Sequence, residues 1–177
     1  MLPIDMAVRR WMLAHRVAPL YATMRVVTEL GAKEVLAPIA AFIGWRLFRG
    51  GESLVALFAF CGLAAGEFVA LLKRSFHIAR PAGGIAAGLG FSFPSGHSTG
   101  AAAVAVVVSY VSLRRGIHPR IVIPVSIALA LLVGFSRPYL DVHWTSDVIG
   151  GWLVGMSFGA GCCAIYEWMT LRGGRRD

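Results

Sequence analysis

Five long runs of apolar residues divide the chain, and each is about long enough to cross a membrane as a helix. They lie at residues 32–48, 53–72, 96–113, 119–136 and 147–171. A helix crosses a hydrocarbon core of about 30 Å with about 20 residues. Backbone groups in lipid must be hydrogen-bonded internally, which favours helices. The pattern therefore predicts an all-α integral membrane bundle with five transmembrane helices.

The N-terminal segment, residues 1–30, has a different pattern in which charged and apolar side chains are mixed. Its polar residues include Asp5, Arg9, Arg10, His15, Arg16, Arg25 and Glu29. This mixture favours an amphipathic helix that lies in the membrane interface and is broken near Pro19. A sixth span here would place Arg16 or Arg25 deep in lipid, which is unfavourable. Whether residues 4–30 span the membrane or lie on it stays open.

The composition supports a membrane protein and limits the classes of partner that we expect it to bind. The 177 residues are 57% hydrophobic and 15% charged, whereas soluble domains have about 25% charged residues. The length fits one domain over residues 1–177. The net charge of +8 lies mostly between apolar runs, without a basic and aromatic stripe, so we expect no nucleic-acid partner. Loop charges and an anionic substrate explain this charge better.

Arginines with no evident chemistry predict the orientation of the bundle. They lie between the first and second runs, between the third and fourth, and after the fifth: Arg46, Arg49, Arg114, Arg115, Arg120, Arg172, Arg175 and Arg176. Alternating helices place all of them on one side, which the positive-inside rule makes cytoplasmic. The opposite side then holds the end of the second run, the start of the third and the turn between the last two.

Three polar clusters between residues 73 and 147 fall on that non-cytoplasmic side. The first is Lys73-x6-Arg80-Pro81, which supplies two cations. The second is Pro94-Ser95-Gly96-His97, in which Ser95 is a good N-cap and the following helix start can bind an anion. Taken alone, the first cluster is weak evidence, because Lys73 is also typical of a lysine at the membrane edge. For the second cluster taken alone, an ordinary capped helix start with an interface histidine is the favoured interpretation.

The third cluster is Ser136-Arg137-x5-His143-x3-Asp147. His143 and Asp147 are four residues apart, so one helical turn can bring them together. A carboxylate bound to one ring nitrogen leaves the other nitrogen free as a nucleophile. Arg137 can bind two phosphate oxygens at once. The three clusters together predict one pocket that holds a phosphate and cleaves it.

The three clusters, in this order and spacing, resemble the signature of the type 2 phosphatidic acid phosphatase superfamily. That superfamily includes bacterial membrane lipid phosphatases and the soluble vanadium haloperoxidases. Every signature position is matched between Lys73 and Asp147. Membrane members often have six spans, whereas this chain shows five apolar runs.

The resemblance implies a role for each residue of the signature. Phosphate would be bound by five residues: Lys73, Arg80, Ser95, Gly96 and Arg137. His143 would attack phosphorus, Asp147 would orient His143, and His97 would protonate the leaving oxygen and then activate water. No cofactor or metal is expected. The implied enzyme is a phosphatase of the bacterial inner membrane, with its site facing the periplasm or the cell exterior.

The substrate implied by this resemblance is a lipid phosphate among membrane lipids. Polyprenyl pyrophosphate, phosphatidylglycerol phosphate and phosphatidic acid are the leading candidates. The same residues would serve a lipid phosphotransferase, and a lipid-phosphate-binding protein without activity is the non-enzymatic alternative. A haloperoxidase is disfavoured because those enzymes are soluble. Neither the particular lipid nor the oligomeric state follows from the sequence.

Several residues near the clusters carry weaker expectations. Glu67, inside the second run, is left out of the site, and Tyr139 and Asp141 could influence access of a headgroup. The uncharged loop 82–93 is either a flexible connection or a mobile entrance to the site. The glycines of the last run predict close helix packing: Gly150, Gly151, Gly155, Gly159 and Gly161.

Overall fold

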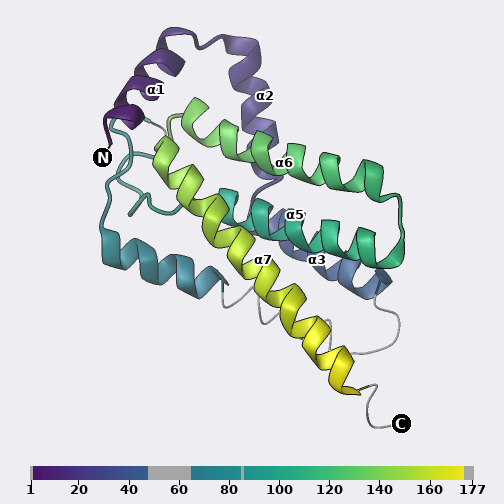
Figure 1. Ribbon diagram of the computed structural model, residues 1–177. Coiled ribbons are helices and arrows are strands. Elements are labelled where there is room, and N and C mark those ends of the chain that lie inside the picture. Colours follow the sequence, from purple (N-terminus) through teal and green to yellow (C-terminus); the bar gives the residue numbers. More distant parts are fainter. Residues whose placement is uncertain (1, 48–64, 85, 174–177) are drawn as a thin grey trace.

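The computed structural model describes residues 2–47, 65–84 and 86–173, and these residues are mainly helical. Within those ranges the strand-like pairing is limited to an isolated bridge between Ala79 and Phe91. The helices shown in Figure 1 are α1 (Pro3–Ala14), α2 (Ala18–Glu29), α3 (Lys33–Leu47), α5 (Gly96–Arg115), α6 (Pro119–Tyr139) and α7 (Thr145–Gly173). Residues 65–76 are also helical. The all-α prediction is confirmed for the described residues.

Three of these helices, α5, α6 and α7, are long and apolar enough to cross a membrane. They match the last three predicted spans closely. The first predicted span corresponds to α3, which has 15 residues. Most of the second predicted span, residues 53–72, lies outside the described residues, although its end belongs to the helical stretch 65–76. The total of five spans therefore stays a prediction.

Helix α5 is the centre of the bundle and packs against both α6 and α7. Three glycines spaced by four residues bring α7 close to it. A Cβ atom placed on Gly155 would lie 2.1 Å from the carbonyl oxygen of Thr99, and one on Gly159 would lie 2.9 Å from that of Ala103. Gly151 meets the carbonyl oxygen of Ser95 in the same way. Backbones can approach this closely only where side chains are absent.

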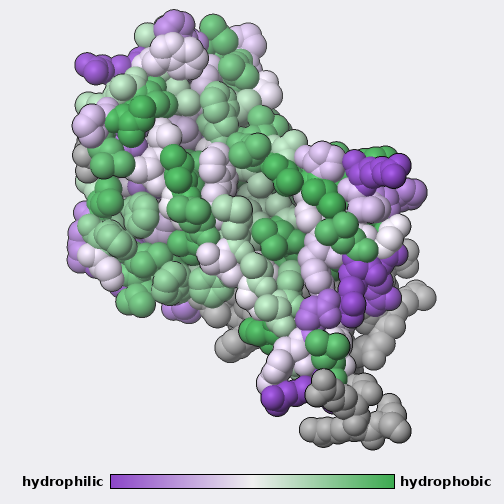
Figure 2. Space-filling view, in the orientation of Figure 1, coloured by the Kyte–Doolittle hydropathy of each residue, from purple (hydrophilic) through white to green (hydrophobic). Residues whose placement is uncertain are grey.

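The outer faces of the long helices are hydrophobic, as expected for contact with lipid. Figure 2 shows apolar side chains spread over α6 and α7, with hydrophilic residues gathered at the ends of the bundle. The exposed basic side chains Arg114, Arg115 and Arg120 lie at the connection between α5 and α6. An apolar belt between polar ends is typical of an integral membrane protein.

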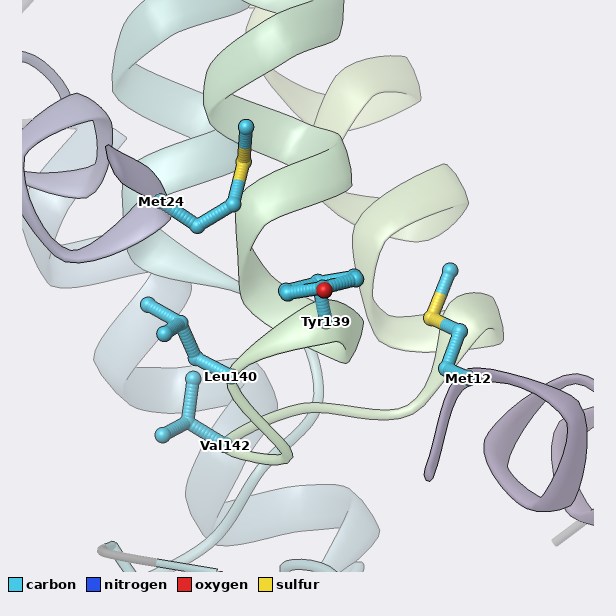
Figure 3. Packing of buried hydrophobic residues seen from close by; sticks show 5 residues of the cluster. All are labelled: Met12, Met24, Tyr139, Leu140 and Val142. Carbon is cyan, nitrogen blue, oxygen red and sulfur yellow. The ribbon is translucent and has the colours of Figure 1, made fainter. Parts of the chain in front are cut away.

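The N-terminal segment forms two helices instead of one long helix. The break falls at residues 15–17, and Pro19 lies in the first turn of α2, where a proline is well tolerated. Met12 of α1 and Met24 of α2 pack with Tyr139, Leu140 and Val142 at the end of α6 (Figure 3). Both helices therefore cover the end of the bundle at which α6 ends and α7 begins (Figure 1). The position of α1 in the membrane interface stays a prediction.

Candidate active site

His143 lies in the short connection between α6 and α7, and its side chain is buried. The Nδ1 atom of its ring lies 3.3 Å from the Oδ2 atom of Asp147, in the first turn of α7. The same oxygen accepts a hydrogen bond of 2.8 Å from the backbone N–H of Trp144. Because Asp147 is fully buried and held by this second contact, it can fix the orientation of the His143 ring.

The other ring nitrogen of His143 faces Arg80. The Nη1 atom of Arg80 lies 3.1 Å from Nε2 of His143 and 2.8 Å from the carbonyl oxygen of Val142. A guanidinium group can only donate hydrogen bonds. Nε2 must therefore accept, which places the proton of a neutral ring on Nδ1, where it can be donated to Asp147. This tautomer leaves the lone pair of Nε2 directed toward the guanidinium group.

Burial also keeps the His143 ring neutral. Removal from water lowers the pKa of His143 to about 4, and the positive charges of Arg80 and Arg137 act in the same direction. The hydrogen bond to Asp147 opposes this effect and raises the pKa only in part. A neutral imidazole with a free lone pair is the form that can act as a nucleophile.

The second cluster lies directly beside the third. Ser95 is the N-cap of α5, and its backbone N–H donates a hydrogen bond of 3.0 Å to the carbonyl oxygen of Asp147. Gly96 is exposed, and a Cβ atom placed on it would meet no other atom within 4 Å. The first turn of α5 is therefore open to a ligand at Gly96. His97 lies on the same turn, within electrostatic reach of Arg80, Arg137 and His143.

Lys73 and Arg137, the other two cations of the clusters, contact different neighbours. The Nζ atom of Lys73 donates to the backbone carbonyl oxygens of Phe91 and Ser92, at 2.9 and 3.1 Å, just before the second cluster. Arg137 is buried in the last turn of α6, and its Nη1 atom donates to the hydroxyl of Thr28. Its Nε atom is buried and has no partner among the described residues. Arg137 therefore keeps one N–H donor without an acceptor among the described residues.

Comparison with known proteins identifies the family of this chain. The family model described as the PAP2 superfamily matches residues 53–171, which is more than half of the chain. The chain belongs to the PAP2 superfamily. The region matched contains all eight residues that the sequence analysis placed in the site.

Relatives of this PAP2 protein include named enzymes. It is 32% identical to phosphatidylglycerophosphatase B of Bacillus subtilis (strain 168) over 139 residues, which cover 75% of this chain and 68% of that one. It is 31% identical to an undecaprenyl-diphosphatase of Sulfolobus acidocaldarius over 147 residues, which cover 80% and 68% of the two chains. The family and these relatives make this chain an integral membrane phosphatase.

Solved structures support the same conclusion. The crystal structure of a transmembrane PAP2 type phosphatidylglycerolphosphate phosphatase from Bacillus subtilis superimposes with a TM-score of 0.84 at 29% identity, covering 93% of this chain and 85% of that one. The structure of Aquifex aeolicus LpxE superimposes with a TM-score of 0.71 at 25% identity, covering 91% and 95%. The described helices of this PAP2 phosphatase therefore have the arrangement of its family.

Helix α2 and the residues just after it contribute two contacts to the site that the sequence analysis missed. Thr28 accepts the hydrogen bond from Arg137. A Cβ atom placed on Gly31, just after α2, would lie 3.1 Å from Cβ of His97 and 2.4 Å from Cγ1 of Val133. Gly31 therefore allows the chain to pass directly behind His97. No pattern in the sequence signals either contact, because they depend on how α2 packs against α6.

Helix α1 contributes charged residues that the sequence analysis left without a role in the site. Asp5 is 1% exposed and Arg9 is half-buried, whereas the apolar Ile4 and Trp11 are more than half exposed. The spacing of four between Asp5 and Arg9 was the available signal, because it places both on one helical face. That face turns toward the connection that carries His143.

The loop at residues 82–93 borders a cavity next to the first cluster. The cavity has a volume of about 370 Å³ and is lined by Ala79, Arg80, Ala82, Ala87, Gly88, Gly90 and Phe91. Arg80 is the charged residue of this lining, and the rest is small or apolar. Whether the loop is an entrance to the site or a simple connection stays a prediction. Tyr139 and Asp141 are both buried, and Glu67 is exposed on the helical stretch 65–76, outside the site.

Proposed function

We propose that this phosphatase hydrolyses a lipid phosphate or lipid pyrophosphate at the non-cytoplasmic face of the membrane, through a phosphohistidine at His143. The proposed mechanism rests on one observation about His143. The buried, neutral ring of His143 donates from Nδ1 toward Asp147 and directs its Nε2 lone pair toward Arg80. A phosphate that binds to Arg80 would meet that lone pair directly.

In the first step, Nε2 of His143 attacks phosphorus and the bond between phosphorus and the leaving oxygen breaks. His97 donates a proton to that oxygen, so that the lipid alcohol or lipid monophosphate leaves in a stable form. The proton on Nδ1 stays shared with Asp147, which stabilises the positive charge that develops on the ring. The products of this step are the released lipid and a phosphohistidine.

In the second step, His97 removes a proton from water, and the resulting hydroxide attacks the phosphohistidine. The bond between Nε2 and phosphorus breaks, which restores neutral His143 and releases inorganic phosphate. Lys73, Arg80 and Arg137 would hold the phosphoryl oxygens in both steps. Together with the helix start at Ser95 and Gly96, these cations stabilise the negative charge, so the mechanism requires no metal.

The names of the relatives support lipid substrates. Phosphatidylglycerol phosphate and a polyprenyl pyrophosphate correspond to the substrates named for the two sequence relatives, and phosphatidic acid is a third candidate. The apolar lining of the cavity beside Arg80 suits the part of a lipid next to its phosphate. Hydrolysis is proposed over transfer to another lipid.

The test of this activity is phosphate release by detergent-purified protein in the presence of a chelator. We expect release from at least one of these three lipids and loss of at least 99% of it with His143→Ala. Full activity of His143→Ala would overturn the mechanism. Appearance of phosphate on an added acceptor lipid, with little free phosphate, would identify a transferase.

The proposal that the active site faces the non-cytoplasmic side of the membrane rests on the positions of the arginines. Arg114, Arg115 and Arg120 lie at the α5–α6 connection, and the three clusters lie at the opposite ends of these helices. Ala87 and Ile117 are exposed at the two ends. With a membrane-impermeant maleimide, Ala87→Cys should be labelled in intact cells and Ile117→Cys only after lysis, relative to the unsubstituted protein. The reverse pattern would contradict the proposed side.

A further inference from the structure

Two residues of α1 hold the connection that carries His143 at both of its ends. Asp5 accepts hydrogen bonds from the backbone N–H and the hydroxyl of Ser146, at 2.9 and 2.8 Å. Arg9, one turn further along α1, binds both carboxylate oxygens of Asp141 at 2.7 and 2.8 Å. His143 lies between these two anchor points. The side chains on one face of α1 thus bracket the nucleophile.

Arg9 also joins this connection to the segment that carries Arg80. Its Nη2 atom donates a hydrogen bond of 2.5 Å to the carbonyl oxygen of Ala82. The two segments approach closely, since a Cβ atom on Gly84 would lie 1.8 Å from the carbonyl oxygen of Asp141. One guanidinium group therefore bridges the chain beside His143 and the chain beside Arg80.

The backbone at Asp141 shows why such an anchor is needed. Asp141 has φ of 58°, in the left-handed region that residues other than glycine adopt at an energetic cost. Conformations of this kind persist where the surroundings hold them in place. Asp141 is buried, and the salt bridge with Arg9 supplies the opposite charge that a buried carboxylate requires.

We propose that Asp5 and Arg9 are positioning residues of the active site, which hold His143 in register with Arg80 from a helix outside the three motifs. This inference rests on the proposed role of His143 as the nucleophile. Neither residue touches the reacting atoms, so each acts through the chain that it binds. A misplacement of about 1 Å at a reacting group can lower a rate about a hundredfold.

The main test compares Arg9→Gln with Arg10→Ala, because Arg10 is the exposed neighbour on the same helix. We expect Arg9→Gln to lower kcat about tenfold to a hundredfold, with a change in KM of less than about threefold. Arg10→Ala should match the wild type. Arg9→Gln activity within twofold of the wild type in monodisperse protein would overturn the proposal.

Asp141→Asn removes the negative charge of this side chain without changing the backbone, because asparagine also tolerates the left-handed region. We expect this variant to lose kcat, but less than Arg9→Gln, which also removes the hydrogen bond to the carbonyl oxygen of Ala82. The double variant should lose no more than Arg9→Gln alone, since both substitutions remove the contact between Arg9 and Asp141. Additive losses would contradict a shared positioning contact. Gly84→Ala, which removes no charge but separates the two segments, should also lower kcat.

Two further variants make the outcome of this experiment unambiguous. If Arg9→Gln does not fold, Arg9→Lys keeps the charge but loses the bidentate contact. A loss of kcat of about tenfold or more in folded Arg9→Lys would support the proposal, and wild-type kcat would overturn it. Measurement of His143→Ala in parallel separates the two hypotheses. An active His143→Ala rejects the mechanism, whereas an inactive His143→Ala with a fully active Arg9→Gln rejects only the positioning role.

Discussion

The Nη1 atom of Arg80 lies 3.1 Å from the Nε2 atom of His143, the nitrogen to which we assign the attack on phosphorus. In this arrangement one guanidinium group contacts the nucleophile and can bind the phosphate that the nucleophile attacks. A phosphate that draws Arg80 away from Nε2 would also free the lone pair. The same contact lowers the pKa of His143 through the positive charge of Arg80.

The first prediction concerns the tautomer of His143. Asp147→Asn replaces a carboxylate, which can only accept, by an amide that can present an N–H group to Nδ1. The ring would then lose the negative charge that favours a proton on Nδ1, so the tautomer with a nucleophilic Nε2 would be stabilised less. We expect kcat to fall about a hundredfold or more. Phosphate release under saturating substrate measures this, and an unchanged kcat would show that Asp147 does not set the tautomer.

The second prediction is a pair of opposite shifts in pH dependence. Because the pKa of His143 is about 4, the part of the acid limb of kcat/KM that comes from His143 should lie near that value in the wild type. Arg80→Gln removes a positive charge that lowers this pKa, so the acid limb should move to higher pH. Asp147→Asn removes a partner that raises it, so its residual activity should show a limb at lower pH.

Exposed Arg74 provides the control for this experiment, and Arg74→Gln should leave the acid limb in place. Ionisation of the substrate phosphate, near pH 6, is common to all variants and cancels in their comparison. The free energy of unfolding should also depend on pH through the pKa of His143. Because the folded value lies below the ordinary value of about 6.5, His143 reduces the free energy of unfolding as pH falls from about 6.5 through about 4.

The third prediction concerns Thr28, which accepts a hydrogen bond from Arg137. Thr28→Val keeps the volume but removes the acceptor, so the guanidinium group loses a contact that orients it. We expect binding of vanadate, as a phosphate analogue, to weaken about tenfold, which corresponds to the loss of a hydrogen bond to a charged group. Thr23→Val is the control, because the Thr23 hydroxyl donates within α2, to the carbonyl oxygen of Pro19. Equal vanadate affinity in both variants would contradict this role.

The fourth prediction concerns the packing of α7 on α5. Gly155→Ala would place a methyl group 2.1 Å from the carbonyl oxygen of Thr99, so the helices must separate. We expect this overpacking to lower the free energy of unfolding by about 1–3 kcal/mol. Gly161→Ala on the same helix meets no atom within 4 Å and should be neutral or stabilising. Thermal unfolding in detergent tests the pair, and equal melting temperatures would refute the packing argument.

Much of the site followed from local sequence patterns. The spacing of His143 and Asp147 predicts their contact because residues four apart meet over one helical turn. Ser95 was predicted as an N-cap from its position after Pro94, and it caps α5. The assignment of the eight site residues to catalytic and binding roles stays a prediction. For the glycines of α7, spacing alone did not separate Gly155, which faces α5, from Gly161, where an added Cβ would have no described atom of another element within 4 Å.

The sequence by itself determined that this protein is an apolar, all-α chain of the PAP2 type, because hydrophobic run length and motif spacing are local properties of the chain. Only the tertiary structure decided that α1 contacts the connection that carries His143 and that α2 contacts Arg137. The contacts of Arg9 with Asp141 and of Thr28 with Arg137 join residues more than a hundred positions apart. Such pairs depend on how whole helices pack, and charged residues in an amphipathic segment give no local signal of the partner that they will meet.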